Sequence, residues 1–194
     1  DYYLNDNFKT IDKNLALLHC CKSKNEYLEL KDIQKYIDYL PKCHNYRLNL
    51  IVDQGEIDSN ITIENFYGCG MICIYGADTS ETFTHKVRRI TFRNNNLPFS
   101  SVTGITGTAN EGIVFYILRE TGYRYVYKCN VPDKTEVAFL ANETDNKAYF
   151  SECHASNSGI AFATMMGGCN INYPLGLGNN IIFKAENGGI MSIR

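Results

Sequence analysis

A short unit of the form Ile-x-Phe, or a close variant of it, returns at nearly even intervals through the second half of the chain. Its copies begin at positions 90, 113, 137, 160 and 181, so the steps are 23, 24, 23 and 21 residues. A second series of β-branched and aromatic triplets lies about half a period later, with steps of 23, 23, 21 and 21 residues. Strand-like units that recur every ~20 to 25 residues, with no helical pattern between them, are typical of a β-solenoid, whose turns stack in parallel.

The two series predict which residues lie above one another. The first consists of Ile90-Thr91-Phe92, Ile113-Val114-Phe115, Val137-Ala138-Phe139, Ile160-Ala161-Phe162 and Ile181-Ile182-Phe183. The second runs through Val102, Tyr125-Val126-Tyr127, Ala148-Tyr149-Phe150, Cys169-Asn170-Ile171 and Ile190-Met191-Ser192. We expect each Phe of the first series to stack on its counterpart in the next turn, at the spacing of neighbouring strands, about 4.8 Å.

The segments between the strand-like units are rich in Asn and Gly, as in Asn94-Asn95-Asn96 and Gly178-Asn179-Asn180. Both residue types tolerate the left-handed backbone of tight corners. A leucine-rich repeat has a similar period, but Leu is scarce after Leu50. A β-sandwich also gives frequent turns, but it does not predict that the Ile-x-Phe unit returns only at every second strand. We therefore predict an all-β parallel solenoid over residues 47–194.

The first 46 residues carry helical patterns instead. Leu4, Phe8, Ile11, Leu15 and Leu18 follow a 4-3-4-3 spacing, which predicts a helical or coiled-coil stem over residues 1–22; an ordinary amphipathic helix is the alternative. In residues 23–46, Leu30, Ile33, Ile37 and Leu40 fall on one helical face that ends at Pro41. We predict that this second helix caps the open end of the solenoid, where unpaired strand edges would be exposed.

Several positions that alternation places on the outside of the solenoid are small or apolar. If Ile and Phe of each triplet point inward, the outward positions are Thr91, Val114, Ala138, Ala161 and Ile182, and two residues further along Arg93, Tyr116, Leu140, Ala163 and Lys184. A solvated face should be polar, so we expect another segment or another protomer to cover it. With the possible coiled coil, this favours a homotrimer. In the second series, an inward Tyr125, Tyr127 and Cys129 would leave Arg124, Val126 and Lys128 outside.

The net charge of −2 gives no basic footprint for nucleic acid or for a membrane surface. No apolar run reaches the ~18 residues of a transmembrane helix. The eight cysteines form no CxxC pair, so a metal site is not predicted. We interpret them as reduced thiols, as in proteins made in a reducing cytoplasm. Cys129 and Cys153 lie 24 residues apart, which predicts an interior ladder.

No catalytic, cofactor-binding or metal-ligating residues are predicted, and no cofactor. The acidic residues are scattered over turns. Glu111 and Glu136 each lie shortly before a strand of the first series and could align one turn apart, as the two carboxylates of a glycosidase do. Solvated turn residues are the simpler interpretation. Exposed aromatic residues such as Tyr123 or Tyr173 could stack on a sugar ring.

Four stretches resemble tail-associated β-helix proteins of bacteriophages or prophages of Gram-positive bacteria: "DNFKTIDKNLALL", "LKDIQKYIDYLPK", "ITIENFYGCGMICIYGA", and "VTGITGTANEGIVFYI" followed by "YVYKCNV". The resemblance implies a right-handed, pectin-lyase-like parallel β-helix behind a helical stem and cap. It also implies a trimeric virion component, a tail fibre or baseplate protein, made in the bacterial cytoplasm. Such a component attaches to the host surface or connects tail parts, with other tail proteins and host polysaccharide as partners. The alternatives are a tailspike-type polysaccharide depolymerase and a cell-surface adhesin.

Overall fold

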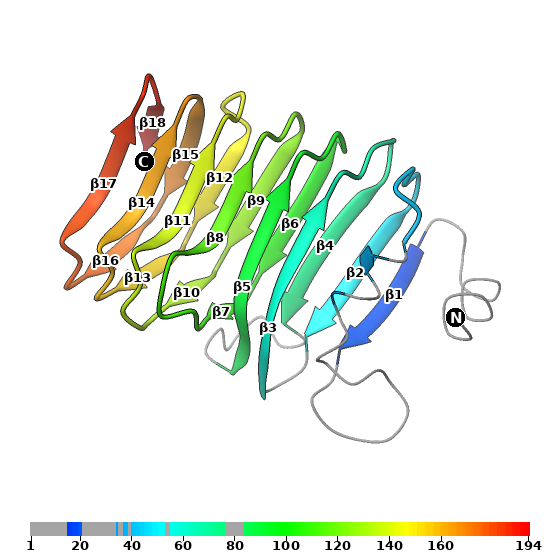
Figure 1. Cartoon of the computed structure of the whole chain (residues 1–194), viewed down its shortest axis with the longest axis horizontal. Helices are drawn as coiled ribbons and strands as arrows, with labels where there is room; N and C mark the ends of the chain where they lie inside the picture. Colours follow the sequence, from blue (N-terminus) through cyan, green and yellow to red (C-terminus); the bar gives the residue numbers. More distant parts are fainter. Residues whose placement is uncertain (1–14, 21–33, 35–36, 39, 53–54, 77–83) are drawn as a thin grey trace.

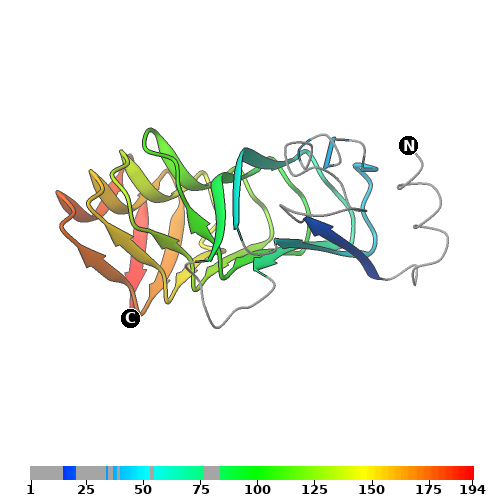
Figure 2. The same ribbon diagram turned by 90° about the horizontal axis from the view of Figure 1, so that it is seen from below.

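The computed structural model describes residues 15–20, 34, 37–38, 40–52, 55–76 and 84–194. Within them the chain is a stack of short strands that forms a β-solenoid of about six turns. Successive turns follow one another along the long axis in chain order (Figures 1 and 2), and every strand pairing is parallel. The prediction of an all-β parallel solenoid is thereby confirmed.

One wall of the solenoid is an eight-stranded sheet, to which each complete turn contributes one strand and to which the two ends of the stack add one strand each. Its order follows the chain: β1 (Leu15–Cys20), β2 (Arg47–Val52), β4 (Met71–Gly76), β6 (Phe99–Thr103), β9 (Tyr123–Tyr127), β12 (Ala148–Ser151), β15 (Gly168–Asn172) and β18 (Ile190–Ile193).

The rest of the solenoid is a ten-stranded sheet that divides in two. Its first strands are long: β3 (Gly55–Glu64) and β5 (His85–Arg93). After β5, one branch contains β7 (Thr106–Gly107), β10 (Asn130–Val131), β13 (His154–Ser156) and β16 (Leu175–Leu177). The other contains β8 (Ile113–Leu118), β11 (Val137–Asn142), β14 (Ile160–Met165) and β17 (Ile181–Glu186).

The division begins at β5, whose two halves pair with different strands. Val87 pairs with Gly107 of β7, 20 positions later, whereas Ile90 pairs with Phe115 of β8, 25 positions later. The five additional positions correspond to the connection 108–112 between β7 and β8. From there on, a corner interrupts what was one straight strand, and the solenoid has three walls instead of two.

The predicted phenylalanine column is present in four of its five members. Phe115, Phe139, Phe162 and Phe183 pair in register, and their rings stack at centroid distances of 5.1, 5.0 and 5.8 Å. The prediction is wrong for Phe92, which pairs with Ile117 instead. The 23-residue step predicted that Ile90 pairs with Ile113, but the inserted corner shifts the register by two residues, so that Ile90 pairs with Phe115.

The predicted outward positions of the first series are partly wrong. Val114, Ala138 and Ala161 are fully buried and belong to the core, because the strand begins at the corner and two successive side chains are directed inside there. A methyl group added to Gly107 of the facing branch would lie 2.1 Å from Val114, which shows how closely the branches pack. Two residues further along, the expected outward column does exist: Tyr116 is half-buried, and Leu140 and Ala163 are covered although they lie outside the core cluster.

The first predicted helix is wrong where it can be compared, and the second is only partly described. Residues 15–20 form strand β1, paired in full register with β2; a short apolar run is ambiguous between helix and strand, and tertiary pairing decides. The remainder of the predicted stem lies outside the described residues, as does most of the predicted cap. Of the cap, Ile37 and Leu40 are buried in the core. The Gln34 side chain donates to the Thr62 carbonyl and accepts from its N–H, at 3.0 and 2.6 Å, as a strand backbone would.

Candidate carbohydrate-binding face

The outer face of the eight-stranded sheet presents a group of aromatic side chains. In β9, Arg124 and Val126 are buried, so Tyr123, Tyr125 and Tyr127 alternate with them on the outside. The expectation that Tyr125 and Tyr127 point inward is therefore wrong. The reason is the burial of Arg124, which the sequence pattern alone does not reveal.

Neighbouring turns continue this group. Phe99 of β6 and Tyr149 of β12 also lie on the outside of their strands, and Tyr149 pairs in register with Tyr125. The Tyr125 and Tyr149 rings stack at 4.5 Å with an angle of 5° between their planes. The ring centroids of Phe99 and Tyr125 are 5.4 Å apart, and those of Tyr123 and Tyr149 are 6.2 Å apart. We call these five residues the tyrosine face: Phe99, Tyr123, Tyr125, Tyr127 and Tyr149.

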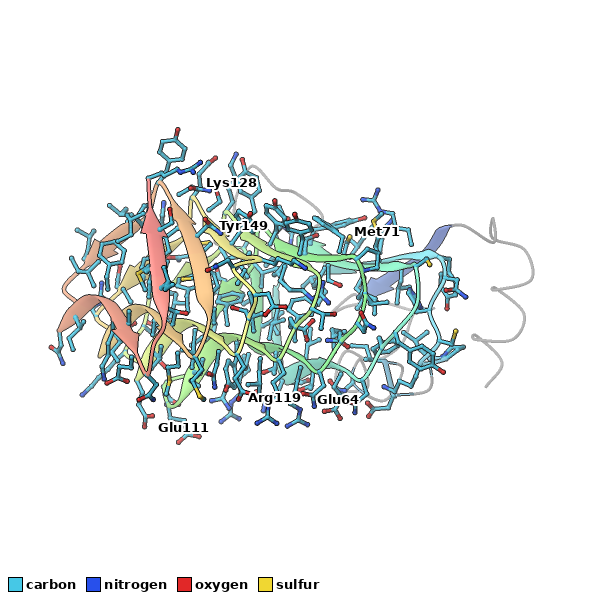
Figure 3. The ribbon with its side chains drawn as sticks, turned by 90° about the horizontal axis from the view of Figure 1, so that it is seen from above. Glu64, Met71, Glu111, Arg119, Lys128 and Tyr149 are labelled. Atoms are coloured by element: carbon cyan, nitrogen blue, oxygen red, sulfur yellow. The ribbon has the colours of Figure 1, made fainter. Side chains whose placement is uncertain are left out.

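Figure 3 shows where this face lies. Tyr149, Lys128 and Met71 lie along one side of the solenoid, whereas Glu64, Arg119 and Glu111 lie along the opposite side. The opposite side carries ion pairs between turns, including Arg93 with Glu64 and Arg119 with Glu143. The aromatic group thus lies on one side of the stack, and these two ion pairs lie on the other.

The phenol of Tyr125 at the centre of the tyrosine face has a raised pKa. Desolvation raises the pKa of Tyr125, and the neighbouring phenols of Tyr149 and Tyr123 raise it further. Tyr127 donates a hydrogen bond to Glu152 at 3.0 Å, and Lys128 lies 3.8 Å from the same carboxylate. The face therefore offers ring surfaces together with fixed polar groups, the combination found in small-molecule sites.

An open groove of about 540 Å³ adjoins the face at Tyr123. We call it the Tyr123 groove. Among its lining residues, the Thr121 hydroxyl group donates a 2.8 Å hydrogen bond to Asn96 Oδ1. Lys147 donates to the Thr121 carbonyl at 2.9 Å, and its Nζ lies 5.9 Å from the Tyr123 ring centroid. The groove is lined by Gly68, Cys69, Asn96, Leu97, Pro98, Thr121, Gly122, Tyr123 and Lys147.

A buried ion pair fixes the backbone beneath the groove. Arg124 and Glu120 are 0% and 2% exposed, and the guanidinium donates to the carboxylate at 2.5 Å. The Arg124 Nη1 group donates to the backbone carbonyls of Leu97 and Tyr123, and Nη2 donates to the Asn95 carbonyl at 3.4 Å. Asn95 donates to Glu120 from its backbone and its side chain, at 3.0 and 2.7 Å. Such complete hydrogen bonding is what makes a buried ion pair tolerable.

Each of the two charges opposes the pKa shift that burial causes in the other. Burial raises the pKa of Glu120, while Arg124 and the Asn95 donors oppose that shift. Burial lowers the pKa of Arg124, and Glu120 opposes it. Gly122, between them, has no room for a side chain, because an added Cβ would lie 1.8 Å from the Leu97 carbonyl oxygen. The segment Glu120–Arg124 is therefore held in one geometry.

The carboxylates that the sequence singled out are not brought into register. Val137 pairs with Ile113, which aligns Glu136 with Gly112, so Glu111 lies one position earlier in its turn. Glu111 is exposed, and Arg88 lies 3.5 Å from its carboxylate. Of the two tyrosines expected to be exposed, Tyr123 belongs to the tyrosine face, and Tyr173 is exposed at a corner after β15.

The cysteines give no chemical site in the described part of the chain. No group of three or more metal-ligating side chains occurs there, and the six cysteines whose side chains the structure describes are free. Cys129 and Cys153 lie at equivalent positions of neighbouring turns and are buried, which confirms the interior ladder. Burial raises the pKa of Cys129 to about 12, so it is an unreactive thiol.

Comparison with protein-family models, with curated proteins and with solved structures finds no match. Among the described residues, no helix has the length and apolar character needed to cross a membrane. The fold and the surface define the class: a parallel β-solenoid with an exposed aromatic face. Sequence analysis singled out Tyr123 alone of that face. The signals that mark the rest are the 24-residue interval between Tyr125 and Tyr149 and the Glu120–Arg124 pair in "ETGYR".

Proposed function

We propose that this chain is a structural and adhesive component of a bacteriophage tail, a tail fibre or baseplate protein that contacts host surface polysaccharide. In this proposal the solenoid is of the right-handed, pectin-lyase-like type, its assembly is a homotrimer, and it is carried on the virion after synthesis in the bacterial cytoplasm. The observation that carries the proposal is the tyrosine face.

The tyrosine face suits weak, repeated contact with saccharides. The Tyr125 and Tyr149 rings are held parallel at 4.5 Å by strands that pair in register. Their positions are fixed before binding, so little conformational entropy is lost on contact. A row of aromatic rings beside hydroxyl and amino groups can pack on the apolar faces of sugar rings while hydrogen bonding their edges.

Self-association is supported by a different surface. The outward column on the ten-stranded sheet contains Tyr116, Leu140 and Ala163, aligned by register in neighbouring turns. Leu140 and Ala163 are each only 5% exposed and Tyr116 is half-buried, so the accessible part of this column centres on Tyr116. A second protomer packed on this column would cover the Tyr116 ring. This column faces outward from another sheet than the tyrosine face, so a trimer formed through it leaves the tyrosine face for other partners.

Two measurements test the proposal. Phage particles from the strain that encodes the chain are labelled with gold-tagged antibody, and label on the tail is expected. Sedimentation of the purified chain should give a trimer, and Tyr116→Lys, at the half-buried member of the column, should give monomers. A chain absent from particles but present on the bacterial surface would favour the adhesin instead.

Adhesion is measured separately by the binding of fluorescent protein to host cells. The double variant Tyr125→Ala/Tyr149→Ala is expected to lose at least tenfold in bound fluorescence, whereas Arg119→Ala on the opposite side should bind like the original protein. Release of reducing ends from the host glycan during the same incubation would instead support the depolymerase alternative.

A further inference from the structure

We infer that the Tyr123 groove binds an acidic sugar residue, with the sugar ring on Tyr123 and its anionic group against Lys147. The inference rests on the proposed function, because it assigns a ligand class to one end of the tyrosine face. Three features of the groove carry it: its charge, the distance between the ring and the ammonium group, and the rigidity of its backbone.

The charge of the groove is positive. Lys147 is the one Lys, Arg, Asp or Glu among the lining residues. In the described part of the chain no carboxylate pairs with it, in contrast to Lys128, which lies against Glu152. Glu120 directly precedes the lining residue Thr121 in sequence but is buried and bound to Arg124. Asp145 is not among the lining residues. An anion in the groove therefore meets a cation and no lining carboxylate.

The separation of the two groups suits one sugar residue. The Lys147 Nζ lies 5.9 Å from the Tyr123 ring centroid. One of its N–H groups is used by the Thr121 carbonyl, which leaves two donors for a carboxylate or a phosphate. Tyr123 is 47% exposed, so its ring is accessible for stacking. In an acidic sugar the acid group is attached to the ring or to its first substituent. The sugar ring can therefore pack on Tyr123 while its acid group contacts Lys147.

The backbone around the groove is fixed before binding. Arg124 holds the Leu97 and Tyr123 carbonyls, and Gly122 packs against the Leu97 and Pro98 carbonyl oxygens. Because the groove does not have to be ordered by its ligand, a single charge-assisted hydrogen bond is enough to give selectivity. Nucleic acid is not favoured, since a phosphate backbone needs several cations and the chain carries a net charge of −2.

The test uses the full chain on an array of matched oligosaccharide pairs. One set of pairs compares uronic acid oligosaccharides with their methyl esters, and the other compares sugar phosphates with their dephosphorylated forms. The set that shows a preference for its acidic member identifies the acid group as a carboxylate or a phosphate. We expect one acidic class to bind about tenfold more strongly than its neutral partner. Lys147→Gln should remove that preference, Lys147→Arg should keep it, and Tyr123→Ala should weaken both members of each pair.

Lys128→Gln is the matched control, because Lys128 lies on the same side of the molecule but is already paired with Glu152. It should leave the acid preference unchanged. Equal binding of acidic and neutral members, a preference that survives Lys147→Gln, or no binding to any pair would each overturn the inference. None of these results touches the proposed place of the chain in a phage tail, which is tested by its presence in the particle.

Discussion

Two aromatic stacks run along this solenoid, one inside and one outside. The inner stack, Phe115, Phe139, Phe162 and Phe183, has ring separations of 5.0 to 5.8 Å. The outer one joins Phe99, Tyr125 and Tyr149 at 5.4 and 4.5 Å. Parallel register sets both spacings, because equivalent residues of neighbouring turns lie one strand apart.

The two stacks differ in what surrounds them. Phe115, Phe139 and Phe162 are at most 1% exposed, so their rings are removed from water and packed on all sides. The outer residues Phe99, Tyr125 and Tyr149 lie on the outside of their strands and are only half-buried. The same geometry therefore contributes stability inside and a binding surface outside, and substitutions should separate the two effects.

The largest expected effect is on the inner stack. Phe139→Ala should lower the free energy of unfolding by about 3 to 5 kcal/mol, because it removes a ring stacked on both sides and leaves a cavity. Urea denaturation followed by circular dichroism measures it. Phe139→Leu is the control and should cost less than half as much. A loss below ~1 kcal/mol for Phe139→Ala would show that the column is not part of the core.

The buried ion pair should come next. Glu120→Gln removes one charge and leaves Arg124 buried without its counter-ion, which should cost about 3 kcal/mol. The double variant Glu120→Gln/Arg124→Met removes the charge that was left and should recover part of the loss. If the double variant is no more stable than the single one, the ion pair is not what holds this segment.

The next effect depends on pH and concerns another buried residue. His44 is fully buried against Tyr46 and Phe66, and burial lowers the pKa of its imidazole. The unfolded chain therefore binds the proton more readily, so stability should fall as pH drops below about 6.5, the ordinary histidine value. Urea midpoints between pH 7.5 and 5 measure the slope. His44→Asn should flatten it, whatever its effect at pH 7.5; an equal slope in both proteins would refute the assignment.

The outer stack should matter little for folding. Tyr149→Ala removes one stacked ring at the surface and should cost about 1 kcal/mol, well below Phe139→Ala. The same variant should lose most of the binding to host cells. Tyr149→Phe keeps the ring and should keep the stability. If Tyr149→Ala destabilises the chain as much as Phe139→Ala does, the comparison between inner and outer stacks fails.

The smallest effect is expected at a corner on the ionic side. Arg119 has a left-handed backbone, with φ of 54°, a conformation that favours glycine. Arg119→Gly should relieve this strain while losing only an exposed ion pair to Glu143, so the urea midpoint should stay the same or rise. Arg93→Gly is the matched control, because Arg93 makes a similar ion pair from strand β5, and its midpoint should fall. Equal losses in the two variants would argue against strain at Arg119.

The repeat interval predicted the solenoid because each turn reuses the same strand positions. The interval could not predict that Phe92 pairs with Ile117 instead of Phe115. The connection 108–112 adds five residues to that turn, and the length of an interval does not reveal whether added residues form a corner or lengthen a strand. The tyrosine face was missed for a related reason. Alternation in β9 allows either the tyrosines or Arg124 and Val126 to point inward. Arg124 can be buried only because Glu120, four residues earlier, neutralises its charge.

The corners show a similar limit. Sequence analysis marked Asn and Gly, and Asn94 does occupy a left-handed corner with φ of 56°. In the following turns the equivalent corner positions are Arg119, Glu143 and Met166. None of these residue types signals such a backbone. The neighbouring turns impose it, since each corner N–H donates to a carbonyl of the next turn, as Arg119 does to Asn142.

The division of the wall after β5 has a consequence for how such a molecule can diversify. The connection 108–112 enters the stack between β7 and β8, and the pairing on both sides of it stays parallel and continuous. The solenoid can thus accept extra chain at an edge without losing its axial repeat. Connections of other lengths at this position would change the cross-section of the solenoid from turn to turn. The register of the inner phenylalanine stack would stay the same.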